Sequence, residues 1–486
     1  MKKNILIVLF IYFVITFSYS QTITFNKTYN PYAYQEADNI VVYKDGYLML
    51  GGGIDATESG QKVKIIAYYL DEYGTVNWMK TYGDTVYNYY FGDRNSLIEN
   101  VDGGFSLTGA RTGQGNITGM LTKFDQNFDT LWTRLYFDNP AFTAFYNHVQ
   151  TPDGGYALVG CVADTDPDGD VLLVKTDSEG NMEWYKKYGT SEYDLGLCIV
   201  ITSDNGFLIG GGSYFYGNGD NYLLKTDSLG NLEWTKNYGS TCCTDGGITN
   251  IQITNDLGYV CTASHTIYED GMNGYLKYGK ASIKKIDHDF NDVWYKLYGN
   301  ITYQTGFGSV VETINGDFAL TLFEDYPSRS KLLFLNSEGD SLRQVGFEAE
   351  GSLSEQWLLT IKQTPDNGFI MAGVAYDPQV MWLVKTDSCG CVEEDCECGG
   401  SAVESFWLNN EIEVYPNPAS DLLYLQLPVN SGGALVKIYD ATGRIVQSEK
   451  LANNQNAINI RTLTAGSYVL KVQFRDNCWS SGFIKN

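Results

Sequence analysis

The sequence contains few histidines and few basic residues. Only three of its 486 residues are histidine, which argues against a histidine-based metal site or catalytic triad. Lys and Arg total 33 against 58 Asp and Glu, so the formal net charge is −25. Because nucleic acids and anionic lipid surfaces bind basic patches, this balance argues against both as partners. It favours a well-hydrated, acidic exterior.

Long apolar segments and catalytic motifs are also scarce. The one long apolar run, residues 5–17, follows two lysines and precedes Ser-Tyr-Ser. This arrangement predicts a secretory signal peptide over residues 1–20. No later run reaches about 18 apolar residues, so we expect no transmembrane segment in the mature chain. The sequence has no nucleophile elbow, no His-Glu-x-x-His motif and no phosphate-binding glycine loop.

What the sequence does contain is an internal repeat of slightly more than fifty residues. One marker is a turn such as Asp-Gly-Gly or Asp-Asn-Gly, followed by an aromatic residue that opens an apolar run. A second marker follows, as in KTDSEGNMEWYKKYG (175–189) and KTDSLGNLEWTKNYG (225–239), with Asp and Trp seven residues apart. The first marker defines repeats 1 to 7, through Tyr47, Phe105, Tyr156, Phe207, Tyr259, Phe318 and Phe369.

Each repeat is interpreted as four short strands. In repeat 4 they cover residues 197–202, 207–213, 221–227 and 231–239, which are rich in β-branched and aromatic residues and separated by turn residues. No helical periodicity is sustained over a long stretch. Four antiparallel strands per repeat of this length are typical of a propeller blade, so the sequence predicts an all-β fold with a seven-bladed β-propeller over residues 21–398.

Repeat 7 lacks its fourth strand. The missing pattern, Trp-x-Lys-x-Tyr, has a counterpart near the N-terminus, where Phe25, Lys27 and Tyr29 have the same spacing. Because an unpaired sheet edge is a liability, we predict that this N-terminal strand completes the last blade and closes the ring.

The Asp-to-Trp element resembles the tryptophan-docking repeat of pyrroloquinoline-quinone propellers, which has one more residue between Asp and Trp. The resemblance implies a strand-turn-strand unit whose Trp wedges between neighbouring blades. No central set of charged cofactor ligands stands out in this sequence. We therefore interpret these tryptophans as scaffold and expect no quinone cofactor.

The segment between the second and third strands varies in length, whereas the third-to-fourth hairpin is constant. Variable length is typical of loops, and loops carry function. We therefore expect the binding surface at the variable end, with residues 264–281 of repeat 5 and 53–63 of repeat 1 protruding most. The candidate binding residues are His265, Tyr268, Glu269 and Asp270.

In repeat 3 the same segment carries alternating carboxylates, which could surround a hard cation such as calcium. An EF-hand loop would end in Glu where this chain has Lys175. Two interpretations stay open, a calcium site and an acidic turn. The candidate calcium ligands are Asp164, Asp166, Asp168 and Asp170.

Ten cysteines in an exported chain favour disulfides. Four of them form a C-x-C-x4-C-x-C cluster, which is tighter than the usual zinc knuckle. Nested bridges Cys389–Cys398 and Cys391–Cys396 would fasten the chain as it leaves repeat 7. The adjacent Cys242 and Cys243 could bond to each other or to the isolated cysteines Cys161, Cys198 and Cys261.

Beyond a linker at residues 399–410 the repeat ends. Residues 411–486 contain seven short alternating strands with Pro-Asn-Pro and Ala-Thr-Gly turns, which predict a small immunoglobulin-like β-sandwich. This segment resembles the type A C-terminal sorting domain of Bacteroidota type IX secretion. The resemblance rests on Tyr415, Pro416, Asn417, Pro418, Gly443, Gly466, Tyr468 and Lys485.

The resemblance implies an export route and partners. Such a domain directs a periplasmic protein through the type IX translocon and is then typically cleaved by a sorting peptidase, so the passenger is secreted or displayed on the cell surface. The repeats likewise resemble secreted propeller repeats of these bacteria. The sequence thus predicts a non-catalytic binding or adhesion propeller for a glycan or protein. The alternatives are a polysaccharide-acting enzyme with carboxylates in the central funnel and a purely structural surface component.

Overall fold

The part of the chain that the structure describes is built from strands alone, strands β1 to β36, and the predicted all-β fold is confirmed there. The chain divides into unit 1, residues 1–400, and unit 2, residues 401–486. The computed structural model describes residues 23–30, 33–54, 61–113, 115–137, 142–163, 169–189, 193–215, 218–238, 247–271, 274–299, 305–324, 329–352, 354–392, 413–426, 435–440, 445–451, 457–474 and 477–486.

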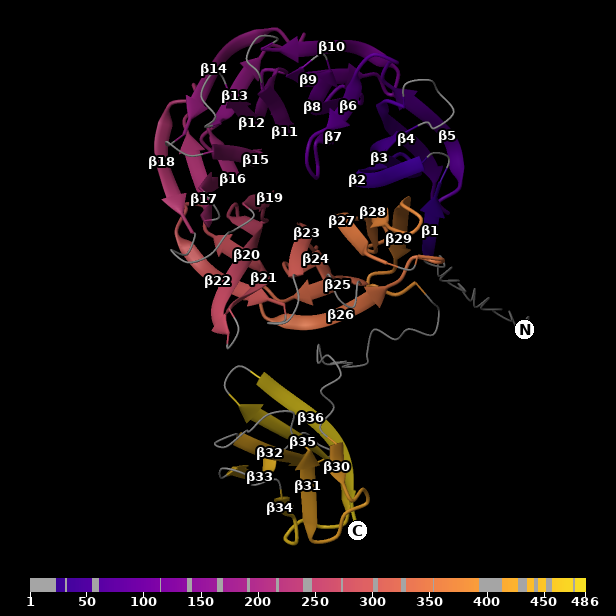
Figure 1. The fold of residues 1–486 in the computed structure, drawn as a ribbon, viewed down its shortest axis with the longest axis vertical. Helices are drawn as coiled ribbons and strands as arrows, with labels where there is room; N and C mark the ends of the chain where they lie inside the picture. Colours follow the sequence, from indigo (N-terminus) through magenta and orange to yellow (C-terminus); the bar gives the residue numbers. More distant parts are fainter. Residues whose placement is uncertain are drawn as a thin grey trace, which may run out of the picture. The chain divides into compact units, whose positions relative to one another are not determined.

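Unit 1 is a set of small antiparallel sheets arranged in a ring (Figure 1). The first strand of each repeat lies nearest the middle of the ring, and the fourth lies outermost. Repeats 1, 4, 5 and 6 each form a four-stranded sheet in chain order. Their strands are β2 (Ala33–Tyr43), β3 (Gly46–Ile54), β4 (Val63–Asp71), β5 (Val76–Tyr82), β15 (Tyr193–Ile201), β16 (Phe207–Phe215), β17 (Asn218–Thr226), β18 (Leu232–Asn237), β19 (Ile248–Ile253), β20 (Tyr259–Gly271), β21 (Gly274–Ile286), β22 (Asp292–Tyr298), β23 (Thr305–Glu312), β24 (Phe318–Glu324), β25 (Arg329–Leu335) and β26 (Ser341–Phe347).

Repeats 2, 3 and 7 depart from this plan. Repeats 2 and 3 share one nine-stranded sheet, because β9 and β11 are joined through the single pair Ile117 and Phe142. Repeat 7 supplies three strands, and β1 pairs with the last of them as the fourth. The strands are β6 (Asn88–Phe91), β7 (Leu97–Glu99), β8 (Phe105–Gly113), β9 (Asn116–Phe124), β10 (Thr130–Tyr136), β11 (Phe142–Gln150), β12 (Tyr156–Ala163), β13 (Asp170–Thr176), β14 (Met182–Tyr188), β27 (Gln356–Gln363), β28 (Phe369–Ala375), β29 (Val380–Thr386) and β1 (Phe25–Tyr29).

The two sequence markers meet inside each sheet. The marker aromatics open the second strands and are buried. In repeat 4 the lysine of the third strand, Lys225, is fully buried and its Nζ lies 2.8 Å from Asp204 of the first marker. Burial raises the pKa of Asp204, but hydrogen bonds from Lys225, Thr202 and the Gly206 amide outweigh it and lower that pKa to about 2. The same ion pair recurs as Lys123–Asp102, Lys175–Asp153, Lys285–Asp256 and Lys385–Asp366.

A second recurring interaction joins five of the seven repeats to the next; after repeat 4 the Phe290 carbonyl accepts from Lys236 instead, and repeat 6 has Phe347 in the tyrosine position. In the third-to-fourth turn, Gly180 has a φ of 75°, a conformation that favours glycine. Its carbonyl accepts a hydrogen bond from Tyr136 Oη of the preceding repeat at 2.7 Å. A Cβ at Gly180 would lie 2.6 Å from the Trp132 ring, so the tryptophan packs directly on the turn. The same hydroxyl-to-turn bond joins Tyr29 to Gly74, Tyr82 to Phe128, Tyr188 to Gly230 and Tyr298 to Gly339.

Two of these turns carry phenylalanine in the glycine position. Phe128 and Phe290 adopt φ values of 60° and 64°, which is uncommon for a bulky residue. Their rings fill the space that a glycine would leave. The Phe128 ring stacks on Phe124 with centroids 4.2 Å apart, and the Phe290 ring stacks on Tyr259 at 5.5 Å. Burial of the ring offsets the backbone cost at both turns.

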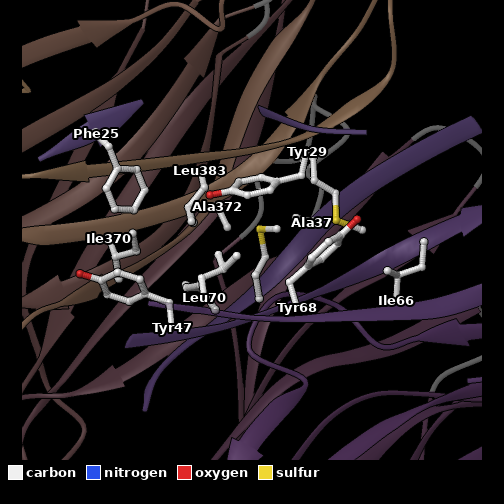
Figure 2. Close-up of a cluster of buried hydrophobic side chains, with 13 residues drawn as sticks. Phe25, Tyr29, Ala37, Tyr47, Ile66, Tyr68, Leu70, Ile370, Ala372 and Leu383 are labelled. Carbon is white, nitrogen blue, oxygen red and sulfur yellow. The ribbon is translucent and has the colours of Figure 1, made fainter. Parts of the chain in front are cut away.

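The contact between β1 and repeat 1 follows the same rule, although β1 is far in sequence from the strands of repeat 7 that it joins. Phe25 lies opposite Lys385 of β29, as Trp234 lies opposite Lys225 in repeat 4. Tyr29 donates to the Gly74 carbonyl at 2.7 Å. Figure 2 shows the resulting cluster, in which side chains of β1 and repeat 7 meet those of repeat 1. It includes Phe25, Tyr29, Ile370, Ala372, Leu383, Tyr47, Ile66, Tyr68 and Leu70.

Unit 2 contains two sheets over one buried core. The three-stranded sheet has the order β30-β31-β34, and the four-stranded sheet has the order β33-β32-β35-β36. Buried side chains of both sheets, including Leu423, Ile438 and Leu470, form a single cluster. The strands are β30 (Glu413–Tyr415), β31 (Leu422–Gln426), β32 (Leu435–Asp440), β33 (Ile445–Lys450), β34 (Ala457–Asn459), β35 (Gly466–Phe474) and β36 (Asn477–Lys485).

Removing the N-terminal strand should destabilise unit 1. A mature chain that begins after Asn30 exposes the edge of β29 and loses the Phe25 and Tyr29 contacts. We expect it to unfold or aggregate. The milder variant Phe25→Ala should lower the free energy of unfolding by about 3–5 kcal/mol, and Tyr29→Phe should lower it by about 1 kcal/mol. Thermal and chemical denaturation measure both effects, and an unchanged melting curve for the truncated chain would contradict the role of β1.

Candidate functional site

The first strand of repeat 2 is interrupted at the middle of the ring. In the other repeats the first strand stays continuous although its pairing with the second strand shifts by one residue, as between Ala37 and Asn39. In repeat 2 the strand instead breaks into β6 and β7; Gly92 and Ser96 still bond to Thr108 of β8, and residues 93–95 leave the sheet. We call residues 92–96 the repeat 2 insertion. Figure 1 shows the β6–β7 connection projecting towards the middle of the ring.

The backbone at both ends explains how the insertion leaves the sheet. The Asp93 amide donates to the Tyr146 carbonyl at 2.8 Å. A Cβ at Gly92 would lie 2.2 Å from that carbonyl oxygen, so only glycine allows this approach. Asn95 then adopts a φ of 61°, a left-handed conformation that Asn tolerates better than most residues. Gly92 and Asn95 therefore turn the chain out of the sheet and back.

Side chains of the insertion contact distant repeats across the ring. Arg94 donates from Nη1 to Thr249 Oγ1 at 3.3 Å and to the Phe307 carbonyl at 3.1 Å. Asn95 Oδ1 accepts a hydrogen bond from Lys362 Nζ at 2.8 Å. The insertion thus ties repeat 2 to repeats 5, 6 and 7 and occupies the middle of the ring.

Ionisable groups around the insertion have shifted pKa values. Asp38 lies where the β2 register shifts, and its Oδ1 is buried without a hydrogen-bond partner among the described residues. Burial raises the pKa of Asp38 to about 8; Glu36 and Asp93 raise it further, and Arg94 opposes them. Burial also raises the pKa of Glu36 and lowers the pKa of Lys362 to about 8. Asp38 is therefore protonated at neutral pH.

A pocket of about 280 Å³ opens beside these groups. Its floor and walls come from repeats 1, 2 and 7, at the end where β3 finishes and β4 begins. It combines carboxyl, amide, backbone and aromatic groups. We call it the channel-mouth pocket, and its lining is Glu36, Asp38, Gly52, Gly53, Ile54, Val63, Tyr89, Tyr90, Phe91, Gly92 and Gln379.

The aromatic side of the channel-mouth pocket is fixed in place. Tyr89 Oη donates to Asp84 Oδ2 at 2.8 Å, and the guanidinium of Arg111 lies 4.2 Å from the Tyr87 ring centre. Tyr90 and Phe91 also border a second, more apolar pocket of about 380 Å³. Their rings are positioned by β6, which pairs with the far end of β8. Successive side chains of a strand point to opposite faces, so Tyr89 and Phe91 face repeat 1 and the channel-mouth pocket, whereas Tyr90 faces the second pocket beside repeat 3.

The predicted binding segment of repeat 5 was expected to be a loop, and the structure differs. Residues 264–271 and 274–281 are not a loop, because β20 and β21 continue as paired strands to Gly271 and Gly274. His265, Tyr268, Glu269 and Asp270 lie on β20, opposite Lys280, Lys277, Leu276 and Tyr275. Their role in binding stays a prediction.

The predicted calcium site lies largely outside the described residues. This applies to Asp164, Asp166 and Asp168. Asp170 is the first residue of β13, and a Cβ at Gly189 would lie 1.9 Å from its Oδ1. Within the described ranges no group of three or more His, Cys, Asp or Glu residues could hold a metal ion. The calcium site stays a prediction.

The cysteines separate into two groups. Cys161, Cys198 and Cys261 are buried free thiols, so they form no disulfide with Cys242 or Cys243. Burial raises the pKa of each of these thiols. In the terminal cluster, Cys389 and Cys391 lie in the repeat 7 turn, where their amides donate to Asp387 Oδ1. Their predicted partners Cys396 and Cys398, like the adjacent pair, lie outside the described residues, and the nested pairing stays a prediction.

In unit 2 the motif residues gather around the end of β36. The Ile484 amide donates to Asn417 Oδ1 at 2.9 Å, and Gly466 lies opposite Lys485. Tyr468 stacks on Phe483 with ring centroids 5.6 Å apart. Of the other motif residues, Tyr415 ends β30 and stacks on Tyr424, Pro416 and Pro418 flank Asn417, and Gly443 lies outside the described residues.

Comparison with known families confirms the assignment of this segment. Residues 413–486 match the secretion system C-terminal sorting domain, so unit 2 directs export by type IX secretion and interacts with that machinery. The chain is thereby destined for the cell surface or the medium. No curated protein matches the sequence. Within the described part of the chain, no helix is long and apolar enough to cross a membrane.

Several solved structures share a distant likeness with the chain. A puromycin hydrolase is 9% identical, with a TM-score of 0.48, over 90% of this chain and 58% of its own. A polysaccharide lyase is 11% identical, with a TM-score of 0.42, over 77% and 94%. The extracellular domains of Drosophila Semaphorin 1b are 8% identical, with a TM-score of 0.43, over 76% and 87%. Likenesses this distant assign neither a substrate nor a partner.

Replacing Asp38 should change how stability depends on pH. In the folded chain Asp38 keeps its proton up to about pH 8, whereas its ordinary pKa is 3.8. Folding therefore takes up a proton between these values, and the contribution of Asp38 to the free energy of unfolding falls as pH rises, by at most about 1.4 kcal/mol per pH unit. Denaturant titrations of wild type, Asp38→Asn and the exposed control Glu350→Gln measure this.

Relative to the wild type, Asp38→Asn should lose this slope, whereas Glu350→Gln should keep it. A wild-type minus Asp38→Asn difference that is constant with pH would contradict the buried, protonated state of Asp38.

Proposed function

We propose that the chain is a seven-bladed β-propeller, exported by type IX secretion, that binds a glycan in the channel-mouth pocket as a secreted or surface-displayed protein. The blade count is supported by the seven sequence repeats. It takes the nine-stranded sheet as two blades, since repeats 2 and 3 are joined there through one residue pair. The immunoglobulin-like form of unit 2 belongs to the same proposal and is supported by its two packed sheets.

The observation that carries the glycan assignment is the composition of the channel-mouth pocket. Sugars present apolar C–H faces and many hydroxyl groups, so they are bound by aromatic rings together with a few convergent polar groups. This pocket offers Tyr89 and Phe91, which share one face of β6, and Glu36, Asp38 and Gln379 for hydrogen bonding. A protein ligand would need a larger apolar surface than this pocket offers.

A polysaccharide-acting enzyme is the second candidate. Glycoside hydrolysis uses two carboxyl groups, one of which donates a proton and has a raised pKa. Asp38 has such a pKa, and Glu36 lies in the same pocket. Release of new reducing ends from a bound polysaccharide, lost in Asp38→Asn, would favour this candidate over a binding protein.

Glycan binding should depend on the aromatic side of the pocket. We expect Phe91→Ala to weaken binding to glycan-array hits by at least about tenfold, taking as a guide the roughly 1–3 kcal/mol that a nucleobase gains by stacking on an aromatic ring. Tyr73→Ala is the matched control, since Tyr73 is exposed at a turn outside the pocket. Equal losses in both variants, or no loss in Phe91→Ala, would contradict the pocket as the glycan site.

Export should depend on unit 2. Deletion of residues 413–486 should leave unit 1 in the periplasm of the producing cell, because the sorting domain is the segment that the secretion machinery reads. Asn417→Ala should reduce export in part, because it removes the acceptor for the Ile484 amide. Immunoblots of periplasm, cell surface and medium measure this, and normal export of the truncated chain would contradict the assignment.

A further inference from the structure

The channel-mouth pocket contains acidic groups without a matching cation. Glu36 and Asp38 both line it. Asp38 Oδ1 is buried, and no described residue donates a hydrogen bond to it. Leaving such an oxygen without a partner costs free energy. A ligand that supplies a donor there would recover that cost.

The nearby basic side chains are already engaged elsewhere. Arg94 donates to Thr249 and to the Phe307 carbonyl, on repeats 5 and 6. Lys362 donates to Asn95 Oδ1. Neither hydrogen bond reaches Asp38, so the pocket keeps an uncompensated acidic side.

The opposite side of the pocket is aromatic. Tyr89 and Phe91 lie two residues apart on β6, so their rings share one face of the strand, and both line the pocket. The faces of aromatic rings attract cations, and the attraction is stronger where water is partly excluded. A carboxyl group facing aromatic rings across a small pocket is an arrangement that suits an ammonium group.

We propose that the glycan bound in the channel-mouth pocket is an amino sugar with a free, positively charged amine. The amine would donate to Asp38 and Glu36, and the sugar ring would lie against Tyr89 and Phe91. This proposal rests on the proposed function, since it names the class of glycan for the same pocket. The acidic exterior, with its net charge of −25, would also concentrate a cationic glycan near the protein.

The same geometry predicts that binding releases a proton. The groups facing Asp38 are Glu36, Asp93, Arg94 and Tyr376. An ammonium beside Asp38 favours its ionised form, so the proton that Asp38 holds in the free protein leaves on binding. While the amine stays protonated, the affinity should therefore rise with pH towards the pKa of about 8 that Asp38 has in the free protein, by at most about tenfold per unit.

The test uses the mature chain and two oligosaccharides that differ only in the amine. Calorimetry compares a glucosamine tetramer, which carries free amines, with the N-acetylglucosamine tetramer, in which every amine is acetylated. We expect the free-amine tetramer to bind at least about tenfold more tightly. Asp38→Asn should remove this preference, whereas Glu350→Gln, which removes one exposed charge elsewhere, should keep it. Titrations in buffers of different ionisation heat measure the released proton.

Four results would overturn the inference. Equal binding of the two tetramers, with loss of binding in Phe91→Ala, would leave the glycan pocket intact but exclude recognition of the amine. Tighter binding of a lysine-rich peptide, or displacement of the sugar by calcium, would show that the pocket prefers a cation other than the amino sugar. Binding of neither tetramer nor any array glycan would remove both this inference and the proposed function. Retention of the preference in Asp38→Asn would assign the amine to a different site.

Discussion

The arrangement of unit 1 depends on one contact, made between the outermost strand of each repeat and the third-to-fourth turn of the next. A tyrosine hydroxyl donates to the carbonyl of a residue with positive φ, and an aromatic ring packs on that turn, as for Tyr136 and Trp132 at Gly180. Burying a large aromatic side chain stabilises by several kcal/mol, whereas the hydrogen bond adds about 1 kcal/mol. Packing therefore dominates, and the hydrogen bond fixes where one sheet sits against the next. Repeat 6 supports this ranking of packing above the hydrogen bond, since Phe347 takes the place of the tyrosine there and is buried without a hydroxyl.

With the outer contacts fixed in this way, the middle of the ring is free to differ between repeats. Repeat 2 uses this freedom. Its insertion sends Arg94 towards repeats 5 and 6 and Asn95 towards repeat 7, and it leaves β6 to present Tyr89 and Phe91 to the channel-mouth pocket. The cost of this arrangement falls on Asp38, because its Oδ1 is buried without a hydrogen-bond partner among the described residues. Groups held in such unfavourable states are more often found at functional sites than in scaffold.

Much of the fold follows from the sequence, because its signals are local and repeated. Each repeat contains its own marker aromatic, its own version of the second marker and its own turn residues. The motifs of unit 2 likewise lie within one segment, which matches a known family. The pocket could not be predicted in the same way. Gln379 and Glu36 are neighbours only because the ends of unit 1 meet, and Arg94 and Phe307 are 213 residues apart in sequence. Segment length also misled the prediction for repeat 5, since a longer connection can equally be a longer hairpin, as β20 and β21 are. One feature of the sequence does mark the insertion. The stretch from Trp78 to Phe105, which contains Gly-Asp-Arg-Asn, is longer than the stretch between the Trp and the next marker aromatic in any other repeat.

The central claim is that function resides at the channel mouth, in the pocket formed by repeats 1, 2 and 7, and not on the protruding hairpin of repeat 5. A crystal structure of the mature chain with its tightest-binding array glycan tests this most directly. The account predicts density for a sugar ring against Tyr89 and Phe91, within hydrogen-bonding distance of Asp38. Density for the glycan along β20 and β21, with an empty channel-mouth pocket, would contradict it.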